Sequence, residues 1–221
     1  TLVVCPRPRS FLEGLSFFDA GDQKTFMDLA RAQGVDILDQ IPVGNSVRVR
    51  AGKKEWDQLL RKAPTPTDQS PNYFARTPEA FRPTPDLPAG TYKAFDSGAL
   101  TWLGVPVDVA EWGAGVSVAV LDTAIGKHPA VAENNMLRFT LVESDTDGQT
   151  ASHGTAVASL IAGNSADIRG MAPAARIIGI QVLDDDGSGD AFTLAKGIVE
   201  AVSRGARVIN LSLGTHSDCF L

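Results

Sequence analysis

Two different hydrophobic patterns divide the chain. Over residues 1–62 short apolar stretches alternate with two amphipathic segments. From about residue 98 onward, near-continuous apolar runs alternate with longer helical patterns. Such runs are typical of strands buried on both faces of a parallel sheet. The pattern therefore predicts a small α+β domain followed by an α/β domain with a doubly wound, mostly parallel sheet.

In the small domain, residues 1–62, the hydrophobic pattern predicts the order strand, helix, strand, strand, helix. Apolar side chains fall on one face of each helical segment, and Gly34 supplies a stop signal for the first helix. A turn over residues 42–45 separates the second and third strands. This order suits a split ferredoxin-like module. The expected strands lie at residues 2–4, 35–41 and 46–50, and the expected helices at 24–33 and 53–62.

Residues 63–97 have a different composition. Seven prolines fall within this stretch, and proline lacks the backbone donor and the φ freedom that regular structure needs. We expect a linker or an extended segment that lies on a surface. Tyr73, Phe74 and Phe81 indicate that it is partly anchored.

Residues 98–221 carry the α/β pattern. Apolar strands alternate with helices of a length that implies right-handed crossovers between parallel strands. Gly205 is expected to end the last helix. The expected strands lie at residues 115–121, 175–183 and 207–213, and the expected helices at 155–162 and 190–204.

Charge and composition exclude several classes of function. The formal net charge is −6 and no basic cluster is present, which argues against a nucleic-acid partner. No apolar run approaches the roughly 18 residues that would span a membrane. Cys5 and Cys219 stand at opposite ends of the sequence. We expect two free thiols, with one long-range disulfide as the alternative.

Two titratable side chains are candidates for catalysis. Asp122 follows the apolar run GVSVAVL, and ligands of open parallel sheets bind beyond the carboxyl ends of the strands. His153 opens a predicted helix, 31 residues after Asp122. Taken singly, the aspartate also fits a helix cap or a turn, and the histidine fits an ordinary surface position.

A third candidate feature is the end of the last predicted strand. Ser212, Leu213 and Gly214 follow Asn210 and Leu211 where the buried strand runs out. One interpretation is a strand that simply passes into a loop. The other is an exposed strand edge that pairs with an extended peptide through main-chain hydrogen bonds.

Four motifs in register resemble the subtilisin-like serine protease family. They are VAVLDTAIGKHP around Asp122, SHGTAVASLIAG around His153, GMAPAARIIGIQVLDDDGSGD after it, and GARVINLSLG. The resemblance spans residues 98–216, and the order Asp before His is that of subtilisin. It implies a serine endopeptidase with a protein or peptide substrate.

The resemblance also implies a role for each candidate residue. Asp122 would orient His153 and stabilise its imidazolium, and His153 would act as general base and then as general acid. Ser212, Leu213 and Gly214 would pair with the main chain of the substrate. Residues 1–62 would be an inhibitory propeptide, and its C-terminal segment would thread the substrate groove as a product-like peptide.

The chain departs from the family pattern in three places. Ala124 stands where the family usually has glycine, and Ala156 stands where a second histidine is common. No Gly-Thr-Ser-Met-Ala segment with the nucleophile is present, and neither Ser217 nor Cys219 has a nucleophile context. We therefore expect the 221 residues alone to be inactive. The missing part of the catalytic domain would lie on another polypeptide or have been removed.

Other interpretations remain open at this point. A pseudoprotease would keep the peptide groove without the chemistry. Asp122 and His153 could be metal ligands, although two ligands make an incomplete set. Residues 184–190 resemble a calcium loop but lack its final Glu. We expect no cofactor for the chemistry and identify no structural calcium site. The family resemblance favours a secreted or periplasmic location.

Overall fold

The computed structural model describes residues 10–78, 100, 102–106, 108–143, 152–165 and 168–214. The chain divides into two compact units, and the division falls between Phe74 and Ala75. The strand expected at residues 2–4 and both cysteines lie outside the described residues. Each unit has its own hydrophobic core and is described by itself.

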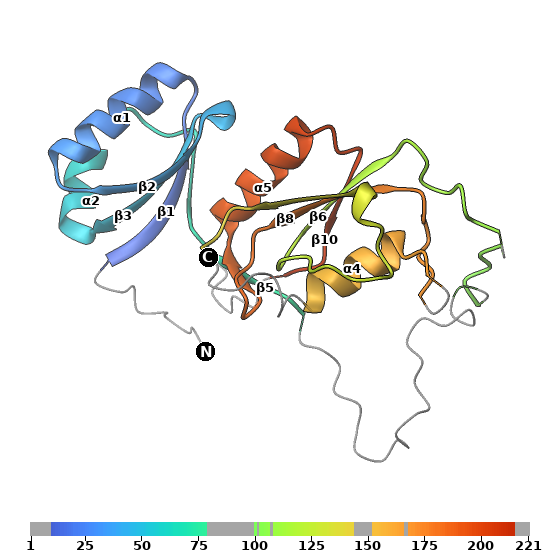
Figure 1. Cartoon of the computed structure of the whole chain (residues 1–221). Coiled ribbons are helices and arrows are strands. Elements are labelled where there is room, and N and C mark those ends of the chain that lie inside the picture. The colour runs from blue at the N-terminus through green and yellow to red at the C-terminus, as the bar shows by residue number, and fades with distance from the viewer. Residues whose placement is uncertain are drawn as a thin grey trace, which may run out of the picture. The chain divides into compact units, whose positions relative to one another are not determined.

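The first unit is a four-stranded antiparallel sheet with two helices packed on it (Figure 1). Its strand order is β2-β3-β1-β4, a ferredoxin-like arrangement, in which the first strand is Ser10–Ser16. The core centres on Phe26, Trp56 and Leu59 from the helices and on Val47 and Val49 from the sheet. The elements are β1 (Ser10–Ser16), α1 (Ala20–Ala32), β2 (Asp36–Ile41), the 3-10 turn η1 (Pro42–Gly44), β3 (Ser46–Gly52), α2 (Lys53–Leu60) and β4 (Asp68–Pro71).

Strand β1 was not predicted from the sequence. Glu13 interrupts its apolar pattern, yet the Glu13 side chain is buried in the folded unit. A charged residue at a core position hides the alternation that identifies a strand. Pairing with β3 on one side and β4 on the other fixes this strand instead.

Helix α1 begins four residues before the expected Lys24. The Asp19 carboxylate accepts a hydrogen bond from the Asp22 amide at 2.8 Å and caps the first turn. This cap gives the Asp22 amide, which has no partner within the helix, an acceptor. The helix can therefore begin before the first residue of its apolar face.

The described part of the proline-rich stretch contains two short strands. Strand β4 pairs with β1 from Ser16↔Asp68 to Glu13↔Pro71, and β5 (Phe74–Arg76) follows. Proline is tolerated at a strand end or on an edge strand, where its missing donor breaks no ladder. Residues 79–97 lie outside the described residues.

The second unit is a four-stranded parallel sheet with the order β10-β6-β8-β7. All three pairings are parallel, as the near-continuous apolar runs predicted. Strand β7 was not predicted; it lies at an edge of the sheet and only its first residue, Met136, is buried. The elements are β6 (Ser117–Asp122), the 3-10 turn η2 (Glu133–Asn135), β7 (Met136–Thr140), α4 (Ser152–Ala162), β8 (Arg176–Gln181), β9 (Ser188–Asp190), α5 (Ala191–Ser203) and β10 (Val208–Leu211).

Helices α4 and α5 cover opposite faces of this sheet (Figure 1). Val118 and Val120 of β6 pack in one cluster with Val157 and Ala158 of α4. The alternate residues of β6 and β8 pack in a second cluster with α5. Since successive side chains of a strand point to opposite faces, the sheet is doubly wound.

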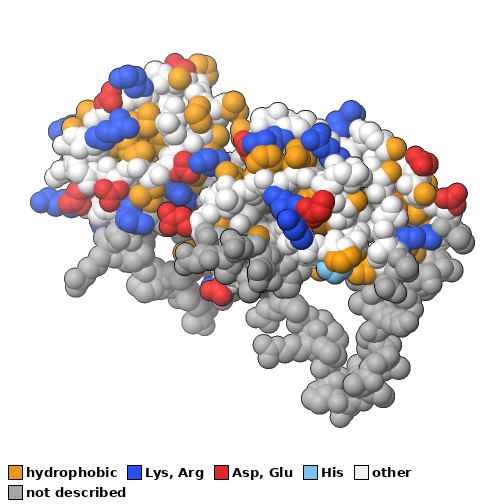
Figure 2. Space-filling model, in the orientation of Figure 1, with side chains coloured by type: hydrophobic (Ala, Val, Ile, Leu, Met, Phe, Trp, Pro, Cys, Tyr) orange, Lys and Arg blue, Asp and Glu red, His pale blue; other side chains and the backbone are white. Residues whose placement is uncertain are grey.

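Charged side chains of both signs are mixed on one face of the described residues (Figure 2). On the face drawn in Figure 2, acidic and basic side chains are interspersed, and neither sign forms a large patch. Within the described ranges, no helix has both the length and the apolar character that a membrane crossing requires.

Candidate active site

The candidate site lies at the carboxyl end of the parallel sheet. Asp122 is the last residue of β6, an inner strand between β10 and β8. Its side chain is 0% exposed. Its backbone carbonyl accepts hydrogen bonds from the amides of Val182 and Leu183, at 2.9 and 3.2 Å. A central strand therefore holds a buried carboxylate at the sheet edge where ligands of α/β proteins bind.

Thr123 contacts the Asp122 carboxylate twice. The Thr123 amide donates to Asp122 Oδ1 at 2.7 Å, and the Thr123 hydroxyl donates to the same oxygen at 3.2 Å. Burying a carboxylate is costly unless donors surround it. Thr123 supplies two of these donors from the position next in the chain.

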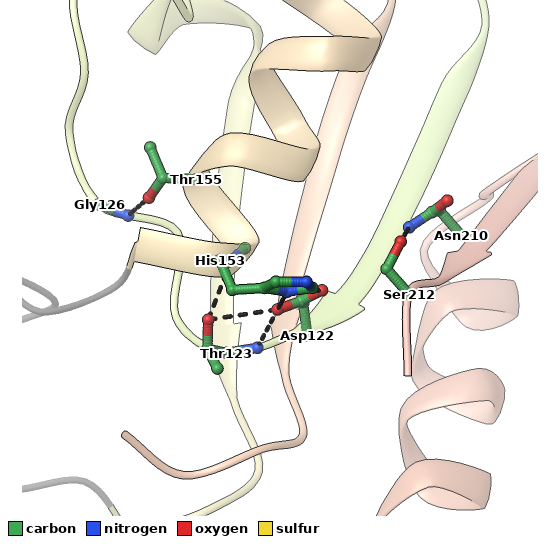
Figure 3. A network of polar contacts seen from close by, with 8 residues as sticks. Asp122, Thr123, Gly126, His153, Thr155, Asn210 and Ser212 are labelled. Atoms are coloured by element: carbon green, nitrogen blue, oxygen red, sulfur yellow. Dashed lines mark hydrogen bonds and ion pairs between the residues drawn. The ribbon is translucent and has the colours of Figure 1, made fainter. Parts of the chain in front are cut away.

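His153 supplies the third donor. Its Nδ1 lies 2.8 Å from Asp122 Oδ1 and 3.0 Å from Asp122 Oδ2, and Figure 3 shows the imidazole lying against the carboxylate. An ionised carboxylate only accepts, so Nδ1 would be the donor in this pair, and in the neutral imidazole Nε2 would then keep its lone pair. The His153 side chain is 33% exposed. The ring therefore contacts the buried Asp122 side chain and is also partly open to solvent.

Gly154 allows the start of α4 to approach the end of β6. Its amide donates to Thr123 Oγ1 at 3.0 Å. A Cβ at Gly154 would lie 2.5 Å from the Thr123 carbonyl oxygen and 3.0 Å from that of Ala124. Only a residue without a side chain fits here. Thr155 Oγ1 adds a second connection by accepting from the Gly126 amide at 2.9 Å.

Arg138 of β7 holds the loop that follows Asp122. Its Nε donates to the Ile125 carbonyl at 2.7 Å, and its Nη2 donates to the Gly126 carbonyl at 3.3 Å. The Glu133 carboxylate accepts from both terminal nitrogens of the same guanidinium, at 2.8 and 2.7 Å. This hydrogen-bonded guanidinium holds the pKa of Glu133 below its usual value of 4.5.

The end of β10 forms the other side of the site. Ser212 Oγ accepts a hydrogen bond from Asn210 Nδ2 at 2.9 Å, and Figure 3 shows the Ser212 side chain turned toward Asn210. Leu213 packs against the core cluster shared with α5. Gly214 exchanges two main-chain hydrogen bonds with Arg76, at 2.8 and 2.9 Å. An extended segment therefore lies against the last residue of the predicted peptide edge.

Residues 184–188 form a hydrogen-bonded turn. Asp184 Oδ1 accepts from the amides of Asp186 and Ser188, at 3.1 and 2.8 Å. This is the arrangement of an Asx turn, and it positions β9. Nowhere in the described residues do three or more His, Cys, Asp or Glu side chains form a group that could hold a metal ion.

The structure brings together two of the predicted residues and adds others. Asp122 and His153 are in direct contact. Sequence reasoning missed Thr123, although it directly follows Asp122, and it missed Arg138, whose role depends on a strand hidden in the sequence. Ser217 and Cys219, which were set aside as nucleophiles, lie outside the described residues.

Comparisons with known proteins agree with this architecture. The family model described as the subtilase family matches residues 113–219. Thermitase of Thermoactinomyces vulgaris is 39% identical over 112 residues, which are 48% of this chain and 40% of thermitase. Subtilisin Savinase of Lederbergia lenta is 43% identical over 108 residues, which are 48% of this chain and 39% of that protein. The chain thus spans about two fifths of these curated relatives.

Two solved structures share the fold over both units. Fervidolysin from Fervidobacterium pennivorans, a keratinolytic enzyme related to subtilisin, aligns with a TM-score of 0.67 at 22% identity, over 95% of this chain and 37% of fervidolysin. The epidermin leader peptide processing serine protease from Staphylococcus aureus aligns with a TM-score of 0.66 at 17% identity, over 94% of this chain and 51% of that protein. Over residues 113–219, with its matched motifs and its parallel sheet, the chain is a match to the subtilase family of serine proteases.

Proposed function

We propose that this chain supplies the Asp and His of an Asp-His-Ser triad in a serine endopeptidase. The observation that carries the proposal is the pair of contacts from His153 Nδ1 to the Asp122 carboxylate, at 2.8 and 3.0 Å. This carboxylate orients the ring and stabilises the imidazolium. Nε2 then takes the proton of the attacking hydroxyl and later delivers it to the leaving amine.

The nucleophile in this proposal comes from a segment outside these 221 residues. None of the serines in the sequence stands in a Gly-Thr-Ser or Gly-x-Ser-x-Gly context. Ser212, the serine within the predicted peptide edge, is hydrogen-bonded to Asn210. The 221-residue chain by itself is therefore expected not to hydrolyse peptides, and the polypeptide that carries the serine is the partner it requires.

Ser212, Leu213 and Gly214 are proposed to bind the substrate main chain. The support is the ladder between Gly214 and Arg76, because a segment of this chain already uses the main-chain groups that a peptide would use. Main-chain pairing gives affinity for any extended peptide, and side-chain pockets give selectivity.

The first unit is proposed to be a propeptide, and Ala75–Thr77 to be the product-like segment that blocks the groove. The ferredoxin-like order of its elements and the position of Arg76 against Gly214 support this assignment. The protein would then be a zymogen whose groove opens when the segment leaves. A secreted or periplasmic location, which the family favours, stays a prediction.

The triad is tested by His153→Ala in the full-length product of the gene. Removing the general base is expected to lower kcat by roughly three orders of magnitude or more while the protein stays folded. A fluorophosphonate should label the full-length protein at serine. A loss of activity below tenfold would contradict the assignment of His153.

A peptide-binding pseudoprotease is the second candidate. It is favoured by the groove pairing, which needs no chemistry to hold an extended peptide. In that case the full-length protein would bind peptides but would resist the fluorophosphonate.

If labelling failed and a chelator abolished an observed activity, Asp122 and His153 would instead be assigned as metal ligands.

A further inference from the structure

An extended segment of the chain lies between two strand edges of the second unit. On one side Arg76 pairs with Gly214, with Arg76 N donating at 2.8 Å and Gly214 N donating at 2.9 Å. On the other side β5 pairs with β9, and the Thr77 amide donates to the Gly187 carbonyl at 2.9 Å. The segment is therefore held by main-chain bonds on both edges, so its register in the groove is fixed.

This register sends neighbouring side chains in opposite directions. Ala75 is 6% exposed and belongs to the core cluster that contains Leu121, Ile180 and Leu183. Arg76, the next residue, is exposed. Side chains alternate along a strand, so only every second side chain of the bound segment packs against the core of the second unit. The position of Ala75 is closed off from solvent, whereas the position of Arg76 faces it.

The backbone of β9 is closely packed against the end of β8 and the residues that follow it. A Cβ at Gly189 would lie 2.5 Å from the Val182 carbonyl oxygen and 2.7 Å from Leu183 Cδ2. Val182 and Leu183 are each 1% exposed. Because Ala75 itself packs in a cluster with Val182 and Leu183, a larger side chain in its place has to displace buried groups or push the segment out.

We propose that this groove selects peptides with a small side chain, alanine or glycine, at the position that Ala75 occupies. It tolerates a large and charged side chain at the next position, where Arg76 lies. The inference rests on the proposed use of the groove for substrate, and it names the class of peptide that the groove accepts. It does not depend on the triad, because it concerns binding alone.

The first test compares Ala75→Leu with Arg76→Leu in the 221-residue chain. Amide hydrogen exchange is measured at Arg76, Thr77 and Gly214. Ala75→Leu should speed exchange at these amides by about tenfold or more, the effect of an overpacking penalty at a buried site. Arg76→Leu adds a similar side chain on the exposed side and should leave exchange within about twofold. Equal protection in the two variants overturns the proposal.

The second test adds peptides to a chain whose own segment has been released. Arg76→Pro removes the donor to the Gly214 carbonyl without enlarging the buried side chain, so it also serves if Ala75→Leu fails to fold. Protection at Ala119 and Ile178 reports that the sheet is intact. The peptide YFARTP should restore slow exchange at Gly214, whereas YFLRTP should not at the same concentration. Restoration by both peptides alike overturns the selectivity.

Activity of the full-length protein separates this proposal from the proposed function. If His153→Ala leaves hydrolysis intact but the two peptides still differ in binding, the triad assignment fails and the selectivity stands. If hydrolysis depends on His153 but the peptides bind equally, the selectivity fails and the triad stands.

Discussion

At the scale of single residues, three hydrogen bonds converge on Asp122 Oδ1. They come from the Thr123 amide, the Thr123 hydroxyl and His153 Nδ1. The Thr123 hydroxyl also accepts from the amide of Gly154, the residue after His153. One side chain thus connects the end of β6 to the start of α4. We infer that Thr123 is a positioning residue for the Asp-His pair.

Thr123→Val tests this role, since valine keeps the shape and removes the hydroxyl. Leaving the Gly154 amide without its acceptor should cost about 1–3 kcal/mol of unfolding free energy. In the full-length protein kcat should fall with KM nearly unchanged, because Thr123 is 7% exposed and its hydroxyl contacts Asp122 and the Gly154 amide. Thr123→Ser should restore both quantities. Equal activity of the Val and Ser variants would contradict the role.

Gly154→Ala tests the close approach of α4. Alanine is normally the better helix former, but its Cβ would lie 2.5 Å from the Thr123 carbonyl oxygen. We expect a loss of about 1–3 kcal/mol in denaturant unfolding. Gly21→Ala in the first turn of α1 is the matched control, because there the nearest atom, 3.0 Å away, belongs to the Asp19 side chain. A Gly154→Ala variant as stable as the control would show that the backbone can relax.

At the scale of elements, the loop after β6 is held from two directions. Helix α4 binds it through Thr155 and the Gly126 amide, and β7 binds it through Arg138 and the carbonyls of Ile125 and Gly126. Glu133 holds the Arg138 guanidinium. The loop that follows Asp122 is therefore held by an ion-paired side chain at the edge of the sheet.

This ion pair predicts a pH dependence. The pKa of Glu133 is lowered in the folded state, so the carboxylate stabilises the fold above its unfolded pKa and the contribution is lost as the pH falls through the folded pKa. The urea midpoint of the wild type should exceed that of Glu133→Gln at pH 7, and the difference should vanish well below pH 4.5. Glu111→Gln, at an exposed carboxylate outside this ion pair, is the control. A difference that persists at low pH would argue against ionisation as its cause.

At the scale of the whole molecule, the two units have separate cores. The first is built around Phe26, Trp56 and Leu59. The second packs α4 and α5 on opposite faces of one parallel sheet. Separate cores allow the units to open independently, which suits a propeptide that must leave a catalytic domain.

Leu59→Ala tests this separation. The side chain is 0% exposed, and its truncation should cost the first unit about 2–5 kcal/mol. Hydrogen exchange should speed in β1 and β3 and stay slow in β6 and β8. Ile178→Ala, also 0% exposed, should give the reverse pattern. A uniform loss of protection in both units would show that they unfold as one.

Local periodicity determined most of the elements. The runs at residues 115–121 and 175–183 became β6 and β8 because a strand buried on both faces must be apolar throughout. The strands that were missed carry weaker signals, since Glu13 breaks the pattern of β1 and prolines mask β4. For these strands the deciding interactions are pairings with distant parts of the chain, which local pattern does not encode.

By itself, the sequence determined the resemblance to subtilases, the parallel α/β class and the choice of Asp122 and His153 as candidate residues, because motif order and hydrophobic pattern are written along the chain. The tertiary structure decided what those residues touch. It placed Nδ1 of His153 on the carboxylate, the Thr123 hydroxyl between two elements, and Arg76 against Gly214. These contacts depend on register and on how closely backbones approach, and both are properties of the packed chain.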